Sequence, residues 1–210
     1  MKVVLVNYNY DPHDWWLDFD LKPDDVIVYD RSDDGKSYSF AAKTYKTQNM
    51  GNVDYDKLNY LIENYDTLPD VFLWGKTNIL KYVDFSLLKE SLKKDVFTSL
   101  LRFDHRTYSD AFGVVNRYNG GIYEERADSW FFNNQELATK FKTWEEWCKY
   151  ISLPRTSFIP FAPGGNYILT KECVHKYPKE FYEKMRDTLP YVANPAEAHA
   201  CERSYYLLWR

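Results

Sequence analysis

Hydrophobic and polar positions in this chain alternate between short apolar runs and helical stripes, the pattern of an α/β protein. The clearest stripe follows Gly51 and repeats at about 3.6 residues. It consists of Tyr55, Leu58, Leu61, Ile62 and Tyr65. A polar break containing Pro69 comes next, and residues 71–74 form an apolar run that ends at Gly75. This segment predicts a helix followed by a buried strand, the repeating step of α/β folds.

Other apolar runs predict further strands. Apolar runs typical of buried strands occur at residues 2–6 and 25–29, and two further apolar runs, at residues 157–161 and 167–169, lie on either side of Gly164 and Gly165. Gly120 and Gly121 predict a hairpin within residues 116–125. A strand is also expected at residues 129–132 and a short edge strand at residues 39–45, and residues 96–103 fit either a strand or a short helix.

Helix signals divide the rest of the chain. Helices are expected at residues 78–82, after Asp84, after Thr170, from Pro178, and over residues 134–151. The last helix has Asn194 as its expected N-cap and Pro195 at its first position. Glu197 stands third, which completes a capping-box arrangement.

The composition fits one soluble globular domain. The chain has 210 residues and 45% hydrophobic residues, enough for a core that needs no disulfides. Its net charge of −4 argues against a general nucleic-acid binder. Aromatic residues make up 19% of the chain, which is high. Two explanations are open: exposed rings that stack on sugars or bases, or the codon usage of an AT-rich genome. The three cysteines form no Cys-x-x-Cys pair and are expected to be reduced and buried.

The N-terminal apolar run stops at Asn7 and is too short for the core of a signal peptide. No stretch of the sequence reaches the length needed to span a bilayer. Unpaired cysteines suit a reducing compartment. We therefore expect a cytoplasmic protein without a transmembrane segment, and the sequence does not set its oligomeric state.

Polar residues cluster around the ends of the predicted strands, where α/β proteins commonly bind ligands. They are Asn7, Tyr8 and Asn9 after the first strand, Asp30 after the second, Asn49 and Gly51 before the central helix, and Lys76 after the strand that follows it. A nucleotide would use such groups for hydrogen bonds. Ordinary solvated turns use the same residue types, so both interpretations stand at this point.

Two further stretches carry candidate chemistry. Asp104 and His105 follow the run at 96–103 and form a candidate metal-binding or catalytic pair. Adjacent residues of an extended chain point in different directions, so the pair is not a ligand motif by itself. Gly164, Gly165 and Asn166 form either a tight turn or a backbone that can approach a substrate closely.

The last predicted helix carries two stripes. The apolar one contains Ala198, Cys201, Tyr205 and Leu208, and the polar one contains His199, Glu202, Arg203 and Tyr206. The polar groups fit either a wall that binds a polyol substrate or a solvated helix face.

These motifs, in this order, resemble a family of uncharacterised proteins of fungi, bacteria and viruses that is similar to nucleotide-sugar glycosyltransferases. The central motif reads Asn49-Met50-Gly51, then Asn64-Tyr65-Asp66-Thr67-Leu68-Pro69-Asp70, then Phe72-Leu73-Trp74-Gly75. Weaker matches are residues 6–11 with Trp15 and Trp16, residues 28–31, Pro178 with Phe181 and Tyr182, and the pair Glu202-Arg203. The family's Arg and Glu after the central glycine are Asn52 and Val53 here.

The resemblance implies a GT-A-like fold, a single Rossmann-like α/β domain with a mixed sheet flanked by helices. Residues 1–105 would form its nucleotide-binding half and residues 106–210 its acceptor-side half. Such enzymes carry an Asp-x-Asp metal site where this chain has Trp74-Gly75-Lys76. The diphosphate still needs positive charge. Either Lys76 supplies it, or Asp104 and His105 hold a divalent Mn²⁺ or Mg²⁺ ion.

The activity implied is transfer of a sugar from a nucleotide-sugar donor to a hydroxyl group of a glycan or another acceptor. Glu202 is the first candidate for the base that takes the acceptor's proton, and Asp104 is the second. The acceptor side would include Gly164, Gly165, Asn166, His199 and Arg203. The alternative is a non-catalytic module of the same fold that binds a nucleotide, a glycan or a protein, which the missing Asp-x-Asp motif favours.

Overall fold

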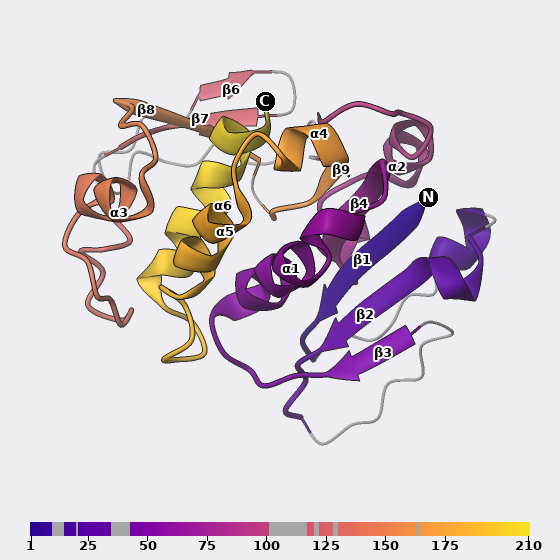
Figure 1. Cartoon of the computed structure of the whole chain (residues 1–210), viewed down its shortest axis with the longest axis horizontal. Helices are drawn as coiled ribbons and strands as arrows, with labels where there is room; N and C mark the ends of the chain where they lie inside the picture. Colours follow the sequence, from indigo (N-terminus) through magenta and orange to yellow (C-terminus); the bar gives the residue numbers. More distant parts are fainter. Residues whose placement is uncertain are drawn as a thin grey trace.

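The computed structural model describes residues 1–9, 15–19, 21–34, 43–100, 117–119, 122–127, 130–162 and 164–210 (Figure 1). It is a mixed α/β structure in which helices flank a six-stranded sheet, as the sequence predicts. The strands of this sheet are β1 (Lys2–Asn7), β2 (Val26–Asp30), β3 (Lys43–Lys46), β4 (Val71–Lys76), β5 (Thr98–Ser99) and β9 (Tyr167–Thr170). Their order is β3-β2-β1-β4-β9-β5.

The first four strands run parallel, and β9 runs antiparallel between β4 and β5. The order β3-β2-β1-β4 is that of the first half of a doubly wound sheet, whose ligand crevice opens where the strand order reverses. The register pairs Asn7 with Asp30 and Val6 with Lys76. The carboxyl ends of β1, β2 and β4 therefore meet at one edge of the sheet.

The helices are α1 (Asn52–Glu63), α2 (Phe85–Ser91), α3 (Trp144–Ile151), α4 (Lys171–Val174), α5 (Lys179–Arg186) and α6 (Ala196–Trp209). Single 3₁₀ turns lie at Trp15–Phe19, Pro23–Asp25, Tyr65–Thr67 and Ile79–Lys81. A second, three-stranded antiparallel sheet contains β6 (Arg117–Asn119), β7 (Ile122–Arg126) and β8 (Phe158–Phe161). The hairpin β6–β7 is confirmed, although its two glycines lie outside the described residues.

Successive side chains of a strand point to opposite faces of the sheet, so the continuous apolar runs bury both faces of the large sheet. On β1, Val4 and Val6 join the larger core cluster with α1, α5 and α6, and Val3 and Leu5 join a smaller cluster with α2. Figure 1 shows α1, α5 and α6 packed together on one side of the sheet. Because β9 and α6 come from the second half of the chain, both predicted halves contribute to one core.

Two predictions for the middle of the chain are wrong. Residues 130–132 form a turn instead of a strand, because Phe131 and Phe132 bury their rings in the core and Asn133 bonds back to Trp130. The predicted helix over 134–151 begins only at Trp144, after an N-cap at Thr143. Side-chain to backbone hydrogen bonds within residues 134–142 compete with helix formation there.

The start of α6 also differs from the prediction. Pro195 is the N-cap, Ala196 is the first helical residue, and no side-chain cap bond forms. Glu197 accepts hydrogen bonds from the Lys140 backbone and from Tyr191 instead. The carboxylate thus ties the 134–142 segment to α6, a role that depends on tertiary contacts.

The cysteines and the lengths of the helices also bear on the sequence predictions. Cys148, Cys173 and Cys201 are buried free thiols, as predicted. Within the described ranges, none of the helices combines the length and the apolar character that a bilayer crossing requires.

Candidate functional site

Two adjoining cavities open at the carboxyl edge of the large sheet. The outer cavity, of about 310 Å³, is lined by Tyr8, Arg31, Asn49, Asn52, Val53, Lys76, Ala193 and Asn194. The inner cavity, of about 140 Å³, is lined by Asn52, Val53, Asp54, Lys76, Gly164, Gly165, Ala198, His199 and Glu202. Asn52, Val53 and Lys76 border both, so the cavities form one cleft. It lies where the strand order predicts a ligand site.

Arg31, the first residue after β2, brings a buried positive charge to the outer cavity. Its side chain is 1% exposed. Nη2 donates to the Asn49 side chain at 3.1 Å and to the Met50 carbonyl at 2.6 Å. Nη1 lies 3.8 Å from Asp56 Oδ2 and has no hydrogen-bond partner among the described residues. A buried donor without a partner is costly, so a ligand oxygen at this wall would be stabilised.

The partner carboxylate of Arg31 is also incompletely satisfied. Asp56 Oδ2 accepts a hydrogen bond from Thr47 at 3.2 Å, whereas Oδ1 has no partner within the part of the chain that the structure describes. Burial raises the pKa of Asp56 to about 6, although the charge of Arg31 acts to lower it. The Arg31–Asp56 pair is therefore loose, and it leaves the guanidinium available to an anion.

Asn7 and Asp30, predicted to bind a nucleotide, lie beneath the outer cavity and do not line it. Both are almost fully buried. Asn7 donates to Asp30 at 3.1 Å and accepts from Thr77 at 2.7 Å, and Asp30 pairs with Lys46 at 2.6 Å. These bonds hold the loops after β1, β2 and β4 in fixed relative positions.

A second polar cluster joins the loops at the mouth of the outer cavity. The Asn9 side-chain amide donates to Asp33 at 2.8 Å, and the Asn49 amide donates to the other oxygen of Asp33 at 2.9 Å. Both amides lower the pKa of this exposed carboxyl group. Of the two predicted asparagines, Asn49 lines the cavity and Asn9 supports the loop beside it.

The start of α1 forms the wall shared by the two cavities. Gly51 has φ +65°, and a Cβ there would lie 2.8 Å from the Leu189 Cβ, so only glycine fits. Gly51 therefore shapes the backbone and does not line either cavity. Asn52 is also left-handed, with φ 53°, and its amide donates to Asn194 at 2.9 Å. Non-glycine residues held in this conformation occur often at active sites and ligand-binding sites.

Lys76 stands at the junction of the cavities, at the end of β4. Its backbone N–H donates to the Asn166 side chain at 2.9 Å. A Cβ on Gly75 would come within 2.9 Å of that same oxygen, so the glycine makes room for Asn166. Asn166 is fully buried and does not line the inner cavity. It holds the backbone that presents Lys76.

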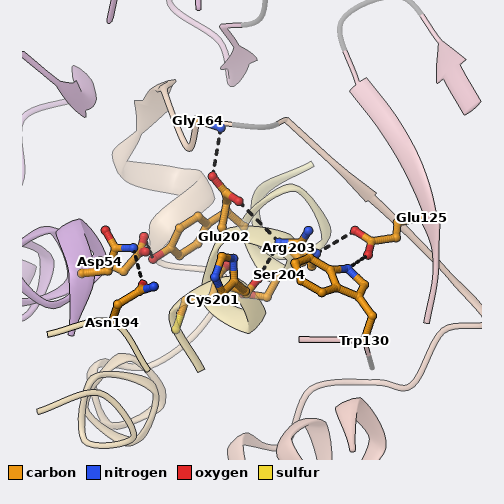
Figure 2. Close-up of polar contacts among 12 residues, drawn as sticks. Asp54, Glu125, Trp130, Gly164, Asn194, Cys201, Glu202, Arg203 and Ser204 are labelled. Atoms are coloured by element: carbon orange, nitrogen blue, oxygen red, sulfur yellow. Dashed lines mark hydrogen bonds and ion pairs between the residues drawn. The ribbon is translucent and has the colours of Figure 1, made fainter. Parts of the chain in front are cut away.

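Glu202, on α6, is the acidic group at the far end of the cleft. Its Oε1 accepts a hydrogen bond from the Gly164 N–H at 2.9 Å, and its Oε2 lies 3.5 Å from Arg203 Nη1 (Figure 2). Burial acts to raise the pKa of Glu202, but the charges of Lys76 and Arg203 outweigh it and leave the pKa below its ordinary value. Glu202 is thus an ionised acceptor at neutral pH.

His199 and Arg203 have different positions on the same helix. His199 lines the inner cavity, and burial together with the charge of Arg203 lowers its pKa to about 4, so it is neutral at pH 7. Arg203 is buried behind Glu202 and pairs with Glu125 of β7 at 2.7 Å. Figure 2 shows this contact continuing from Glu125 to Trp130. Arg203 supports the site and joins α6 to the three-stranded sheet without lining the cleft.

Asp54 and Lys57, both on α1, place opposite charges beneath the inner cavity. Asp54 lines the cavity, and its Oδ1 accepts a hydrogen bond from the Tyr205 hydroxyl at 2.7 Å. Lys57 is fully buried, donates to the Gly165 carbonyl and lies 4.4 Å from the Trp74 ring centre. Burial raises the pKa of Asp54 and lowers that of Lys57 to about 7.

About half of the site residues predicted from the sequence line this cleft. The predicted residues in its wall are Tyr8, Asn49, Lys76, Gly164, Gly165, His199 and Glu202. Asp104 and His105 lie outside the described residues. Within the ranges that are described, no group of three or more His, Cys, Asp or Glu side chains is arranged to hold a metal ion.

The sequence interpretation missed Arg31, Asn52, Asp54, Lys57 and Asn194. The sequence carries a signal for three of them. Asp54 lies four residues before Leu58, and Lys57 lies four residues before Leu61, so both charges fall on the apolar stripe of α1. Arg31 directly follows a buried strand at its carboxyl end, which is also a signal.

No family model matches the chain, and neither curated proteins nor solved structures give a significant match. The resemblance to glycosyltransferases therefore stays a hypothesis from sequence motifs.

Proposed function

We propose that this protein transfers a sugar from a nucleotide-sugar donor to a hydroxyl acceptor on a GT-A-like fold. The observation that carries the proposal is the separation of charge along one cleft. A buried guanidinium, Arg31, lies at the outer end, and one of its nitrogens has no hydrogen-bond partner among the described residues. An ionised carboxylate, Glu202, lies at the inner end. Sugar transfer needs cationic groups for the departing diphosphate and a carboxylate for the acceptor's proton.

In this proposal the nucleoside diphosphate occupies the outer cavity. Its volume of about 310 Å³ is at the lower end of typical ligand pockets, about 300–1,000 Å³. Arg31 and Lys76 face the phosphates, and the amino-terminal end of α1 adds a favourable dipole. Tyr8 and Asn49 border the remaining space, where the nucleoside binds.

The resemblance implies a divalent metal at the end of β4, and the residues there do not fit one. Trp74 is fully buried with its indole N–H donating to the Lys57 carbonyl at 3.1 Å, Gly75 has no side chain, and Lys76 is cationic. None of these supplies the carboxylate oxygens that Mn²⁺ or Mg²⁺ prefers. We propose that Lys76 and Arg31 neutralise the diphosphate in place of a metal bound at this position.

Glu202 is the proposed base. The Gly164 N–H fixes one of its oxygens, and its lowered pKa keeps it ionised and able to accept a proton from a hydroxyl group. Because Glu202 and Lys76 border the same inner cavity, the bond between sugar and phosphate would break close to both groups.

A second candidate is a non-catalytic binding module. The observation that favours it is the same Trp74-Gly75-Lys76 sequence at the end of β4, where the related enzymes carry their acidic metal ligands. Such a protein would bind the nucleotide sugar in this cleft and would not release the nucleoside diphosphate when an acceptor is added.

Isothermal titration calorimetry with uridine, guanosine, adenosine and cytidine diphosphates, with and without a chelator, tests the binding step. We expect at least one to bind, with the same affinity in the presence of chelator. Arg31→Gln should weaken that affinity at least tenfold. Arg155→Gln removes an exposed arginine from a surface pair with Glu145 and should leave affinity unchanged.

The catalytic step is then tested with sugar esters of the nucleotide that binds, incubated with a panel of glycan and small hydroxyl acceptors. Acceptor-dependent release of the nucleoside diphosphate is the expected result. Tight binding without release under any condition favours the binding module. Absence of binding by all four nucleoside diphosphates contradicts the transferase and leaves a module of this fold that binds a glycan or a protein.

A further inference from the structure

The inner cavity has the dimensions of a subsite for one sugar ring. Its volume is about 140 Å³. Each buried water needs on the order of 10–15 Å³ by this measure, so the cavity holds roughly ten waters. That space suits one pyranose ring with its hydroxyl groups and is too small for a nucleoside in addition. The outer cavity adjoins it through Asn52, Val53 and Lys76.

Asp54 is held in the wall of this cavity by a rigid aromatic support. The Tyr205 hydroxyl donates to its Oδ1 at 2.7 Å. The Tyr205 ring in turn stacks on Trp209 at 4.9 Å and packs edge-on against Trp74 at 4.8 Å. The packed Tyr205 ring thus restricts the position of the Asp54 side chain, as binding sites require of a hydrogen-bonding group.

Hydrogen-bond acceptors dominate the polar lining of the inner cavity. Asp54 and Glu202 both border it, and the neutral His199 adds one ring nitrogen that can accept. Sugar hydroxyl groups donate hydrogen bonds readily to carboxyl oxygens. An anionic substituent cannot donate, and it would lie close to Glu202 without a new cation to balance it.

The cations nearest this cavity already have protein partners. Lys57 is fully buried and donates to the Gly165 carbonyl. Arg203 pairs with Glu125 at 2.7 Å, and its guanidinium lies 4.6 Å from the Phe161 ring centre. Lys76 borders both cavities and is the group that the proposed diphosphate uses.

We infer that the inner cavity binds the transferred sugar, that this sugar carries no negatively charged substituent, and that Asp54 accepts hydrogen bonds from its hydroxyl groups. This inference rests on the proposed function and adds the substrate class and a specificity-determining residue. Glu202 keeps its role as base, and Asp54 recognises the ring.

The test compares two esters of whichever nucleoside diphosphate binds best, one with a neutral hexose and one with the corresponding hexuronic acid. The two differ only in a hydroxymethyl or carboxylate group at C6. Titration calorimetry should show the hexose ester binding at least tenfold more tightly than the hexuronate ester. The hexose ester should also bind more tightly than the nucleoside diphosphate alone.

Variants at Asp54 test whether this residue is responsible for the tighter binding of the hexose ester. Asp54→Asn should lower the affinity for the hexose ester severalfold and leave the affinity for the nucleoside diphosphate unchanged, because the outer cavity is intact. Tyr205→Phe keeps the packed ring and releases Asp54, so it should cause a smaller loss in the same direction. Asp66→Asn changes an exposed carboxylate outside the cleft and is the matched control.

The outcomes separate the two proposals. If a nucleoside diphosphate binds but the hexuronate ester binds as tightly as the hexose ester, the inference is wrong and the proposed function stands. The same conclusion follows if both Asp54→Asn and Tyr205→Phe leave hexose binding unchanged. If no nucleoside diphosphate binds, the proposed function and this inference are both overturned.

Discussion

Two pairs of buried opposite charges lie under the cleft, one beneath each cavity, and they are built differently. Under the outer cavity, Arg31 and Asp56 are 3.8 Å apart, and each has an atom without a hydrogen-bond partner among the described residues. Under the inner cavity, Lys57 donates to the Gly165 carbonyl and Asp54 accepts from Tyr205. One pair is left open and the other is completed by the protein.

The difference follows from what each end of the cleft has to do. A buried charge that lacks partners is stabilised when a ligand of opposite charge arrives, so the open pair suits anion binding. A charge whose partners are internal fixes the surrounding backbone, so the completed pair suits a site in which geometry matters. Both pairs draw on the first two turns of α1, which places the two functions on one rigid element.

The largest effect is expected from Glu202→Gln, which keeps the shape of the side chain and removes its basicity. Turnover should fall about 10²–10⁴-fold, the usual contribution of a general base. Nucleoside diphosphate affinity should change less than about twofold, because the outer cavity keeps its cations. Release of nucleoside diphosphate and titration calorimetry measure the two quantities.

Glu180→Gln, on the exposed side of α5, is the control for this substitution. If Glu202→Gln also abolishes nucleotide binding, the two cavities do not have separate roles, because Glu202 would then contribute to binding in the outer cavity as well. Retained turnover would mean that another group accepts the proton.

The pH dependence of stability tests the open pair. Burial raises the pKa of Asp56 from 3.8 to about 6, so the folded state binds a proton more tightly than the unfolded state. The contribution of Asp56 to stability is therefore present below about pH 4 and is lost as pH rises through about 6. At about 1.4 kcal/mol per pKa unit, the loss is about 3 kcal/mol.

Urea unfolding of the wild type and Asp56→Asn at pH 4, 5, 6 and 7 measures this effect. The unfolding free energy of the variant should gain about 2.4 kcal/mol relative to wild type between pH 4 and pH 7. A difference that does not vary with pH would show that Asp56 stays ionised and fully paired with Arg31. The outer pair would then be as complete as the inner one.

Lys76 is the side chain that the two cavities share, so its removal tests how they are connected. Lys76→Gln should weaken nucleoside diphosphate binding by about 1.5–3 kcal/mol, the typical contribution of a charge-assisted hydrogen bond. It should also raise the pKa of Glu202, because the charge of Lys76 is the main group that lowers it. The pH profile of turnover should shift upward accordingly.

The exposed Lys89 of α2 provides the matched charge change, Lys89→Gln. If Lys76→Gln alters affinity and leaves the pH profile in place, the two cavities are electrostatically independent. The two cavities would then be two separate binding sites.

The smallest effects are expected from relieving left-handed backbone. Ser152, with φ 65°, ends α3 away from the cleft, and Ser152→Gly should stabilise the protein by about 0.5–1 kcal/mol. Asn52→Gly relieves similar strain but removes the bond to Asn194, so it should stabilise less and weaken nucleotide binding severalfold. Thermal unfolding and calorimetry measure both variants, and equal effects would exclude a role for Asn52 in the cleft.

Much of the fold could be predicted because the deciding signals are local. Continuous apolar runs specify β1, β2 and β4, and the 3.6-residue stripe specifies α1. The gathering of Tyr8, Asn49 and Lys76 also follows from sequence, since the carboxyl ends of parallel strands meet at one edge. The wrong predictions for residues 130–143 and for the start of α6 come from tertiary hydrogen bonds, such as that of Glu197 with Lys140.

The sequence by itself determined an α/β chain with polar strand ends and a polar stripe on its last helix. Only the tertiary structure decided which charges are buried, because burial depends on what packs over a residue and not on its neighbours in sequence. Asp54 and Lys57 fall on the apolar stripe of α1 in the sequence, but only the fold shows that Tyr205 of α6 and the Gly165 carbonyl are their hydrogen-bond partners. Arg31 becomes an anion-binding candidate only when the fold places it beside a cavity with one nitrogen that has no hydrogen-bond partner within the described part of the chain.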